Sequence, residues 1–346
     1  MPPMNIEIID PCKYPGWNDL LLTNKNCSFF HTSNWAKVLK ESYNYKPCYF
    51  TWIKNGKLSA LFPIMDVRSF LTGSRGVSLP FTDYCQPITC DNDCFQEIFN
   101  EVIKYGKKAR WKYIEWRDFK GIPRDAIPSV SYYGHTLDLS PDKQKVLSSF
   151  RSGTKRNINK AVKEGIDVEL CHSLESVREF YRLNCITRKY HGLPSQPYLF
   201  FKKVHEHIIS MKKGFVALAY HSKNVIAGAV YFHFGEKAIY KYGASDWDYQ
   251  HLRPNNLVMW EAIKSCAQNG FERFSFGRTD LDHEGLLQFK RGWGAKEETI
   301  NYYKFDLTKS AFIKDPSGIK TSYSFFQKLP MPLLKLAGWL FYRHVG

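Results

Sequence analysis

The sequence predicts an α/β protein built from two related halves. The segment EVIKYGKKARWKYIEWRD, which starts at Glu101, resembles EAIKSCAQNGFERFSFGRTD, which starts at Glu261. In both, a stretch with helical periodicity leads through a short turn into a strand whose apolar residues alternate. Upstream, YFTWIKNGKLSALFPIM resembles FVALAYHSKNVIAGAVYFHF, and each predicts two strands joined by a polar turn. Because the same order of elements occurs twice, roughly 160 residues apart, we infer an internal duplication.

The predicted boundary between the halves falls near residues 119–140. The segment FKGIPRDAIPSVSYYG holds two prolines and two glycines and shows no clear period, as expected of a linker. A short strand, HTLDLS, follows, and Ser140-Pro141-Asp142 then predicts a helix start with Ser140 as the N-cap. We expect a first domain at 1–130, a second domain at 135–310 and a basic amphipathic C-terminal tail at 316–346.

Composition and charge narrow the class of protein. The chain has 346 residues and a net charge of +16, which favours polyanionic partners: nucleic acid, anionic lipid or phosphorylated metabolites. Its nine cysteines contain no CxxC pair, so reduced thiols in a cytoplasm are expected rather than disulfides. Cys90 and Cys94 have no second Cys or His pair at matching spacing, so we expect no metal site. P-loop, Rossmann, HExxH and GxSxG motifs are absent from the sequence.

The two ends of the chain bear on its location. The N-terminus carries acidic residues and no apolar segment, so no secretory signal is expected, and no stretch approaches the roughly 20 apolar residues of a membrane span. After Asp315 the tail holds Lys320, Lys328, Lys335 and Arg343 and no acid. Such a tail predicts either a helix that lies in a membrane interface or a terminal helix docked on the protein itself.

The segment FRSGTKRNINKAVKEG, from Phe150 to Gly165, predicts a basic helix that ends at Gly165. An apolar stripe is expected on one face, formed by Leu147, Phe150, Ile158, Ala161 and Val162. The other face carries five cations without an acid, namely Arg151, Lys155, Arg156, Lys160 and Lys163. A solvated basic face is one interpretation. The cations forgo the i,i+4 ion pairs that stabilise exposed helices, however, and bound phosphate would replace those partners.

Two further segments predict sites for acyl-transfer chemistry. A strand that ends at Phe276 and turns at Gly277 leads into QFKRGWG, where Lys290 follows Phe289. A cation held between an apolar run and glycine-framed aromatics can stabilise the oxyanion of a tetrahedral intermediate. The second segment is YKYGASDWDYQHLRPNN, in which a strand at Ile239–Tyr242 crosses a loop to a helix that starts near Pro254 or Asn255. The first turn of that helix, with Arg253 and Asn255, is a candidate anion site.

The motifs HTLDLS, FRSGTKRNINKA, YGAS, FSFG and LLQFKRGWGA occur in that order. The order resembles the second GNAT-like domain of Fem-type aminoacyltransferases and, equally, the GNAT-like proteins encoded among capsule and exopolysaccharide genes. In the first half, FFHTSNWAKVLKE and SLPFTDYCQPI are similar to the family's opening helix and inter-strand loop. The matches run from about Phe29 to Leu307. The resemblance implies an α/β fold of two tandem GNAT-like (acyl-CoA N-acyltransferase-like) domains, with mixed β-sheets flanked by helices.

The resemblance also implies roles for particular residues. Lys290 would stabilise the oxyanion, with Phe289 beside it, and Tyr242 and Asp83 would line a cleft. Contacts to acceptor phosphates would come from Lys37, Arg151, Lys155 and Arg156. The sequence departs from the family in two places. The Q/R-x-x-G-x-G/A loop of coenzyme A-binding relatives is absent, because Arg253-Pro254-Asn255-Asn256 has no glycine, and the coiled-coil arm of some Fem proteins is absent too.

The leading hypothesis is an N-acyl or aminoacyl transferase that acts on an amine of a phosphorylated or lipid-linked cell-envelope precursor, in peptidoglycan or a surface polysaccharide. No bound cofactor is expected, and the donor is aminoacyl-tRNA or acyl-CoA. One alternative is an acetyl-CoA-dependent N-acetyltransferase of the GNAT superfamily. Another is a non-catalytic RNA-binding protein, which the net charge and the aromatic residues would suit. The expected location is the cytoplasm, with peripheral membrane contact at its inner face through the tail as a further option.

Overall fold

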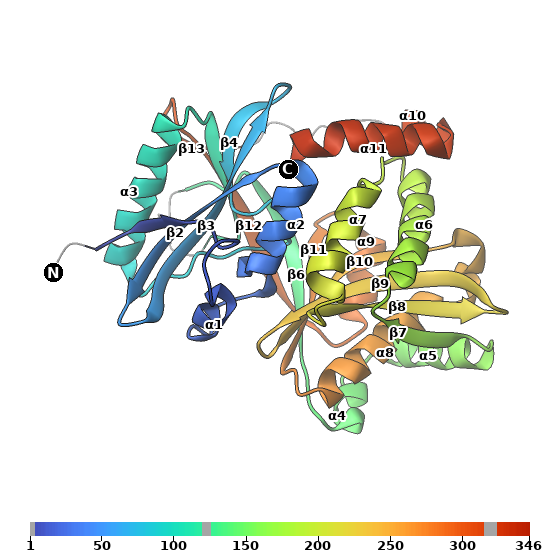
Figure 1. Ribbon diagram of the computed structural model, residues 1–346. Coiled ribbons are helices and arrows are strands. Elements are labelled where there is room, and N and C mark those ends of the chain that lie inside the picture. The colour runs from blue at the N-terminus through green and yellow to red at the C-terminus, as the bar shows by residue number, and fades with distance from the viewer. Residues whose placement is uncertain (1–3, 120–125, 315–323) are drawn as a thin grey trace. The chain divides into compact units, whose positions relative to one another are not determined.

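The computed structural model describes residues 4–119, 126–314 and 324–346 (Figure 1). Its contacts divide the chain into two compact units. The first unit holds Met1–Tyr132, Thr299–Lys320 and Phe341–Gly346, and the second holds Tyr133–Glu298 and Thr321–Leu340. Part of the predicted linker (120–125) and the start of the predicted tail (316–323, with Lys320) lie outside the described residues.

The first unit contains a mixed sheet in the order β1-β2-β3-β4-β5-β12, with β13 paired to β12. Strands β4 and β5 run parallel, and their neighbours pair antiparallel. The bounds are Glu7–Ile9 for β1, Lys46–Lys54 for β2, Lys57–Ser69 for β3, Gly73–Val77 for β4, Tyr113–Arg117 for β5, Lys296–Asp306 for β12 and Ala311–Ile313 for β13.

Helices cover both faces of this sheet. They are α1 (Trp17–Leu22), η1 (Phe29–His31), α2 (Ser33–Tyr43) and α3 (Asn92–Lys108). Phe50 of β2 belongs to the aromatic cluster under α3, whereas the adjacent Tyr49 meets Trp17 of α1 at 5.7 Å between ring centroids. Successive strand residues point to opposite faces, so α1 and α3 lie on opposite sides of the sheet.

The second unit contains a sheet in the order β6-β11-β10-β9-β8-β7, in which β10 and β11 run parallel and β7 to β10 pair antiparallel. The strand bounds are Val130–Asp138 for β6, Asp167–Cys171 for β7, Gly214–His221 for β8, Asn224–Phe234 for β9, Lys237–Ser245 for β10 and Arg273–Asp280 for β11. The helices are α4 (Lys143–Ser148), α5 (Ser152–Lys163), α6 (Leu174–Tyr190), α7 (Tyr198–Val204), η2 (His205–Ile209), η3 (Trp247–Leu252), α8 (Pro254–Gln268) and α9 (Glu284–Arg291). Two more helices follow, α10 (Ser324–Lys328) and α11 (Met331–Val345).

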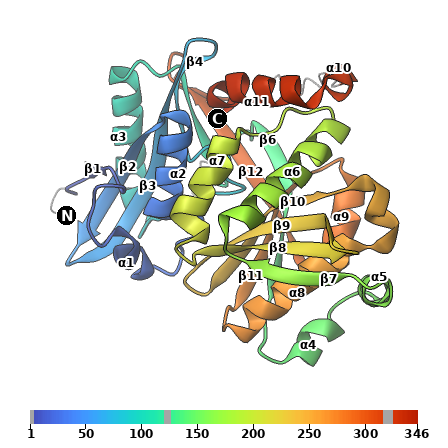
Figure 2. The same cartoon turned by 45° about the vertical axis from the view of Figure 1, so that its right-hand side comes forward.

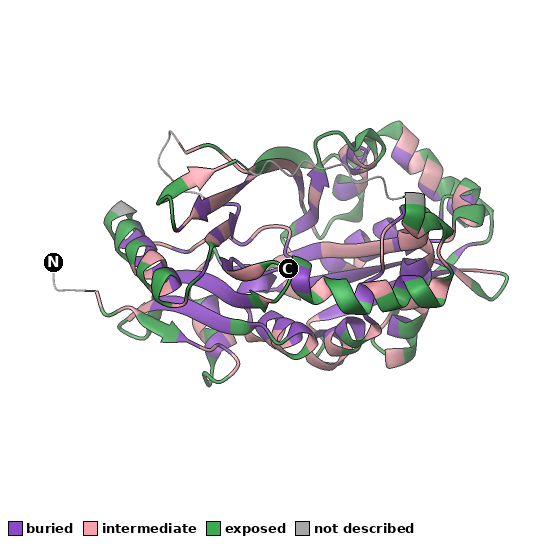
Figure 3. Cartoon of the chain, turned by 90° about the horizontal axis from the view of Figure 1, so that it is seen from above, coloured by how far each residue is buried: buried purple, intermediate pink, exposed green. Residues whose placement is uncertain are grey.

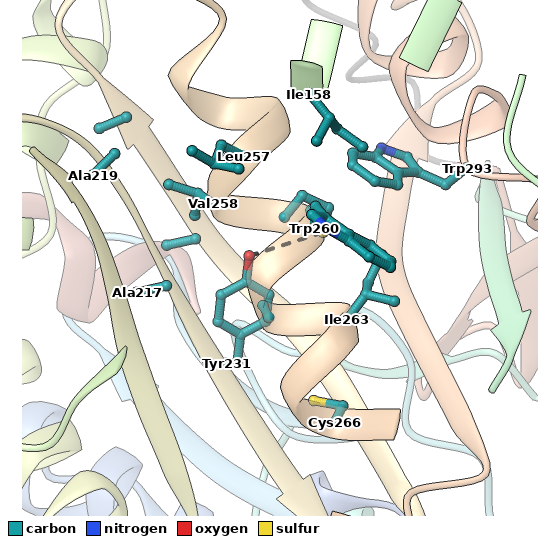
Figure 4. Close-up of a cluster of buried hydrophobic side chains, with 14 of the residues drawn as sticks. Ile158, Ala217, Ala219, Tyr231, Leu257, Val258, Trp260, Ile263, Cys266 and Trp293 are labelled. Carbon is teal, nitrogen blue, oxygen red and sulfur yellow. Dashed lines mark hydrogen bonds between the residues drawn. The ribbon is translucent and has the colours of Figure 1, made fainter. Parts of the chain in front are cut away.

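The main core of the second unit lies between α8 and the sheet (Figure 4). Ala217 and Ala219 of β8 face α8, and their small side chains leave room for Trp260 and Tyr231. Helix α6 covers the opposite face of β8–β10, as Figure 2 shows, with Phe180 packed near Gly228. None of the helices in the described ranges is long and apolar enough to cross a bilayer.

The predicted fold class is confirmed, and so are the two predicted hairpins. Strands β2 and β3 are joined by Asn55 and Gly56, at φ 51° and 70°, and β8 and β9 by Ser222 and Lys223, at φ 48° and 69°. Positive φ at both central residues is the signature of a type I′ turn, whose twist matches that of the flanking strands. The predicted helix–strand repeats are α3–β5 and α8–β11.

The basic segment differs from its prediction. Asp142, not Ser140, caps α4, because its carboxylate accepts the amide of Gln144 at 2.8 Å. The helix is then interrupted: α4 ends at Ser148 and α5 begins at Ser152. Between them, the amide of Arg151 donates to the carbonyl of Gly292 at 3.0 Å. The predicted stripe is therefore divided between α4 and α5. Val162, which was expected on that stripe, is exposed.

Two other expectations differ from the structure. Gly277 lies inside β11 at φ 68°, so the strand continues past it to Asp280 rather than turning there. The expected second domain ends at 310, whereas the contacts return the chain to the first unit from Thr299, within β12. Similarly, the expected separate tail is divided, with Thr321–Leu340 in the second unit and Phe341–Gly346 in the first.

Candidate functional site

The site is built on the parallel pair β10–β11 of the second unit. These strands pair over three positions, Lys237–Ile239 with Arg273–Ser275, although β10 runs on to Ser245 and β11 to Asp280. A register shift between Tyr240 and Tyr242 marks a bulge in β10, at the start of its continuation. Bulges bend a strand and re-aim its side chains, and they are common beside active sites.

Lys290 lies against the continuation of β11. It sits near the end of α9, is 2% exposed, and donates from Nζ to the carbonyls of Gly277 at 3.2 Å and Arg278 at 3.0 Å. The positive φ of Gly277 belongs to the irregular backbone that offers these carbonyls. The prediction that this lysine is held in place, rather than moving in solvent, is confirmed. Its role in catalysis stays a prediction.

Hydrogen bonds to Glu297 of β12 connect β6 and α9 beside Lys290. Glu297 accepts from Nε2 of His135 at 2.9 Å and from Nε of Arg291 at 2.7 Å. Hydrogen bonding to Arg291, reinforced by His135, lowers the pKa of Glu297. Burial, followed by the charge of Lys290, lowers the pKa of His135 and favours its neutral form. Sequence reasoning missed the pairing of His135 with Glu297, because 162 residues separate them. His135 begins the HTLDLS motif, but Glu297 lies two residues beyond LLQFKRGWGA.

The start of the basic helix is tied to the turn that follows Lys290. Both the amide of Arg151 and the hydroxyl of Thr154 donate to the carbonyl of Gly292, at 3.0 and 2.9 Å. A side chain at Gly294 would collide with the carbonyl of Ser149, so the turn needs a glycine there. The structure therefore brings the Phe289–Lys290 pair together with Arg151 and its neighbours.

The basic face carries its charge without compensation. Within the described ranges, none of Arg151, Lys155, Arg156, Lys160 and Lys163 forms an ion pair with a carboxylate. Lys155 donates to the carbonyl of Ser148 at 3.4 Å, and the other four are exposed. Such a face can bind an anion such as phosphate. Phe289 does not share this exposure, since it packs edge-on to the buried Trp293, at 5.8 Å between centroids.

The end of β10 meets the start of α8, which begins at Pro254 as predicted. The side chain of Asn255 donates to Oγ of Ser245, the last residue of β10, at 3.2 Å. Arg253 precedes the helix at φ 63° and is exposed, and the first turn contains no acid and no side-chain cap. These conditions favour an anion at the helix N-terminus. Tyr242, on the continuation of β10, packs against Phe201 at 5.7 Å between centroids.

Two of the predicted site residues belong to the first unit. Lys37 lies on α2 and is half-buried. Asp83 is also half-buried, in the loop after β4, and its carbonyl accepts from the hydroxyl of Tyr302 at 2.8 Å. Their roles toward substrate stay predictions.

A possible metal cluster also lies in the first unit. One ligand atom from each of Cys90, Asp91 and Cys94 lies within 4.8 Å of the others. Asp91 already accepts the amide of Cys94 at 2.7 Å, and burial raises the pKa of the Cys94 thiol to about 12. A neutral thiol is a poor metal ligand, and a closed structural zinc site takes four ligands.

A cavity of about 710 Å³ in the second unit was not anticipated. It is lined by Ile186, Lys189, Tyr190, His191, Gln327 and Met331. Tyr190 stacks on Trp247 at 4.0 Å between centroids, and the amide of Gln327 donates to the carbonyl of Tyr190 at 2.9 Å. Burial and the neighbouring His283 lower the pKa of His191. The run RKYHG in the sequence, basic and aromatic together, was the available signal.

Comparisons with known proteins agree with a GNAT-like α/β fold. Residues 148–291, from the end of α4 to the end of α9, match the model of the family described as Acetyltransferase (GNAT) domain. Among solved structures, "Crystal structure of FemX" superposes with a TM-score of 0.67 at 14% identity, over 86% of this chain and 97% of that one. A "Tandem GNAT protein from the clavulanic acid biosynthesis pathway" superposes at 0.56 and 7% identity, over 88% and 99%. These structures show the fold alone.

Sequence relatives are more specific. The chain is 37% identical over 103 residues to "Lipid II:glycine glycyltransferase" of Staphylococcus haemolyticus, which is 28% of this chain and 25% of the relative. It is 39% identical over 94 residues to the enzyme of that name from Staphylococcus epidermidis, 25% and 23% of the two chains. The match thus spans about a quarter of these curated relatives. The predicted resemblance to Fem-type and GNAT-like acyltransferases is confirmed.

Proposed function

We propose that the protein transfers an acyl or aminoacyl group to an amine of a phosphorylated or lipid-linked cell-envelope precursor. The observation that supports this most directly is the buried ammonium of Lys290, held on β11 just beyond the point where β10 and β11 stop pairing. It lies within the segment that matches the GNAT domain model. The glycyltransferase relatives extend the inference to an aminoacyl group and to a lipid-linked acceptor such as lipid II.

In the proposed reaction, the acceptor amine attacks the carbonyl of an ester or thioester. The carbonyl oxygen gains negative charge in the tetrahedral intermediate, which Lys290 stabilises, by about 2.7–4 kcal/mol if it matches a typical oxyanion donor. The intermediate then expels the alkoxide or thiolate, and the proton lost by the amine goes to that leaving group. The acceptor's own phosphate or carboxylate can relay the proton, so a strong protein base is not obligatory.

Binding of the acceptor is assigned to the basic residues. The uncompensated face of α5, with Arg151, Lys155 and Arg156, and Lys37 on α2 would contact its phosphates. Asp83 and Tyr242 would line the path of the substrates. Because the acceptor is lipid-linked, we place the protein in the cytoplasm and include a peripheral contact with the inner face of the membrane through the C-terminal segment.

The donor is aminoacyl-tRNA in the leading version of this proposal, with no bound cofactor. An acetyl-CoA-dependent N-acetyltransferase is the second candidate, because the acid-free N-terminus of α8 could accept a pyrophosphate. The sequence Arg253-Pro254-Asn255-Asn256 weighs against it, since it lacks the glycines that let such a loop approach a pyrophosphate closely.

The test is a transfer assay with the purified full chain. Detergent-solubilised lipid II is incubated with labelled glycyl-tRNA in one arm and with labelled acetyl-CoA in the other, and the label on the acceptor is measured by mass. Transfer from glycyl-tRNA supports the leading proposal, and transfer from acetyl-CoA alone supports the second candidate. If neither donor nor a panel of other charged tRNAs labels lipid II or an amino-sugar acceptor, the proposed function is wrong.

A further inference from the structure

Helix α11, Met331–Val345, has one face bound to the protein. Leu334 is fully buried, and a side chain at Gly338 would collide with the carbonyl of Ser195. Nζ of Lys335 lies 5.4 Å from the ring centroid of Tyr181, so its stem follows the protein surface while its charge remains near solvent. One side of the helix is therefore docked, as the sequence allowed.

The other face of α11 is apolar and exposed. Leu333 and Leu336 are each 50% exposed, Trp339 is 61% exposed, and Leu340 is exposed as well. Steps of three and four residues place these side chains on one stripe of a helix. In Figure 3 the helix that leads to the C-terminus turns mostly exposed residues toward the viewer. Four large apolar side chains on one outward stripe are more than the scattered single exposures of an ordinary protein surface.

A second apolar element adjoins the last turn of this helix. The tip of the β3–β4 hairpin carries Phe70, which is 84% exposed, and Leu71, also exposed. The ring of Phe70 meets that of His344 at 4.6 Å between centroids. The hairpin also binds the helix end, because Arg75 donates to the carbonyls of His344 and Gly346 at 2.8 and 3.0 Å. Buried hydrogen bonds therefore hold the C-terminal end of α11.

The charges on the C-terminal segment itself are of one sign. From residue 324 to the C-terminus the chain has no acid, while it has Lys328, Lys335 and Arg343. A second copy of this chain would bring two basic faces together, and RNA offers no apolar partner to leucine side chains. An anionic lipid bilayer offers both an apolar interior and negative headgroups, and tryptophan favours its interface.

We propose that the outward face of α11 docks the protein on an anionic lipid bilayer. We call this set the docking face: Leu333, Leu336, Trp339 and Leu340, with the cations Lys335 and Arg343 of the same helix. Its purpose rests on the proposed function, because a lipid-linked acceptor amine lies at such a surface. The docking itself does not depend on turnover.

The test is co-sedimentation of the full chain with vesicles of phosphatidylglycerol and phosphatidylcholine, compared with vesicles of phosphatidylcholine alone. We expect binding to the anionic vesicles, weakened by high salt, and at least tenfold weaker binding for the double variant Leu336→Ser/Trp339→Ser. The matched control is Val162→Ser/Met211→Ser, two exposed apolar residues outside the docking face. Circular dichroism and size-exclusion chromatography establish that each variant folds and report its oligomeric state.

Three results would overturn the proposal: no vesicle binding, equal binding by wild type and the docking-face variant, or a dimer that the variant converts to a monomer. A transfer assay separates this failure from failure of the proposed function. Wild type that binds vesicles but transfers nothing contradicts the function and leaves the docking face. If instead a soluble acceptor analogue is modified while vesicles are not bound, the docking face is wrong and the function stands.

Discussion

The two units contain the same parallel strand pair and use it differently. In the first unit, the chain after β4 pairs with the backbone of β5. The amide of Ser78 donates to the backbone carbonyl of Glu115 and that of Cys85 to the backbone carbonyl of Arg117, both at 2.8 Å. The buried guanidinium of Arg117 then reaches the carbonyls of Leu79 and Thr82. In the second unit, β10 bends at its bulge and continues into η3 and α8, while Lys290 lies on β11. The end of the first strand pair is therefore covered by the loop that follows β4, whereas the candidate catalytic lysine lies beside the second pair.

The helix that connects the two parallel strands of each unit, α3 between β4 and β5 and α8 between β10 and β11, shows the same contrast. The N-cap of helix α3 is Asp91, whose carboxylate accepts the amide of Cys94, and Asp93 lies in the first turn. Helix α8 begins after Arg253, with no acid in its first turn and no side-chain cap. A carboxylate at a helix N-terminus occupies the place that a ligand anion would take. One helix N-terminus therefore carries a carboxylate cap and the other is open, and the open one is where we expect a phosphorylated donor to bind.

The largest expected effects are those of replacing the two buried cations, Lys290 in the second unit and Arg117 in the first. Lys290→Ala should lower turnover at least a hundredfold and leave acceptor binding nearly unchanged, because it removes the proposed oxyanion donor. A Lys290→Met variant keeps the volume and controls for loss of packing. Arg117→Met should instead lower the free energy of unfolding by about 1–3 kcal/mol, since it leaves the carboxylate of Glu115 without its buried partner and removes one donor from each of two carbonyls. Steady-state kinetics and urea unfolding measure both. Full turnover in Lys290→Met would remove this residue from the mechanism.

Acid should weaken the second unit more than the first. Burial lowers the pKa of His233 from 6.5 to about 4, and burial also lowers the pKa values of His135, His172 and His191 in that unit. In the described part of the first unit, burial lowers the pKa of His344. As the pH falls from 6.5 toward 4 the unfolded chain takes up protons first. The stability contributed by His233 is therefore complete above pH 6.5 and lost through that window.

We expect His233 alone to lower the free energy of unfolding by about 1–2 kcal/mol between pH 7 and pH 5. Urea unfolding at the two pH values measures the loss, and His233→Gln should flatten it. Hydrogen exchange at both values locates it, and equal loss of protection in the two units would contradict the comparison.

A smaller effect tests the open helix N-terminus. Asn255→Asp places an acid in the first turn of α8, as Asp93 does in α3, and should weaken binding of a phosphorylated donor by about tenfold. The converse change, Asp93→Asn, is the matched control and should leave donor binding unaltered. Titrations with acetyl-CoA and with charged tRNA, followed by fluorescence, measure both. Unchanged affinity in Asn255→Asp would move the donor away from α8.

The smallest expected effect concerns the caps themselves. Asp91→Ala removes the hydrogen bond to the amide of Cys94 and should cost about 1 kcal/mol of unfolding free energy. Arg253→Ala should change stability by less than about 0.5 kcal/mol, because Arg253 caps α8 with no side-chain hydrogen bond. Urea midpoints at equal slope report the difference. Equal costs at the two positions would mean that the helix N-termini are not distinguished by their caps.

Sequence alone determined the features that depend on a few neighbouring residues. The turn residues Asn55-Gly56 and Ser222-Lys223-Asn224 predicted both hairpins, although Asn224 already belongs to β9. Pro254 marked the start of α8, and Gly165, at φ 72°, follows the end of α5. The glycine-framed aromatic after QFK predicted that Lys290 is held in place. Each of these follows from local backbone preference, which is the same wherever the segment lies in the fold.

Only the tertiary structure decided the features that depend on distant partners. The break before α5 arises because the amide of Arg151 donates to the carbonyl of Gly292, and the pKa of His135 is lowered by burial and by the charge of Lys290. Likewise, one face of α11 is covered where Gly338 meets Ser195, which decides that Trp339 is exposed. A local pattern shows that a helix has an apolar stripe. Which side of it is buried depends on contacts between residues far apart in the chain, and these exist only once the chain has folded.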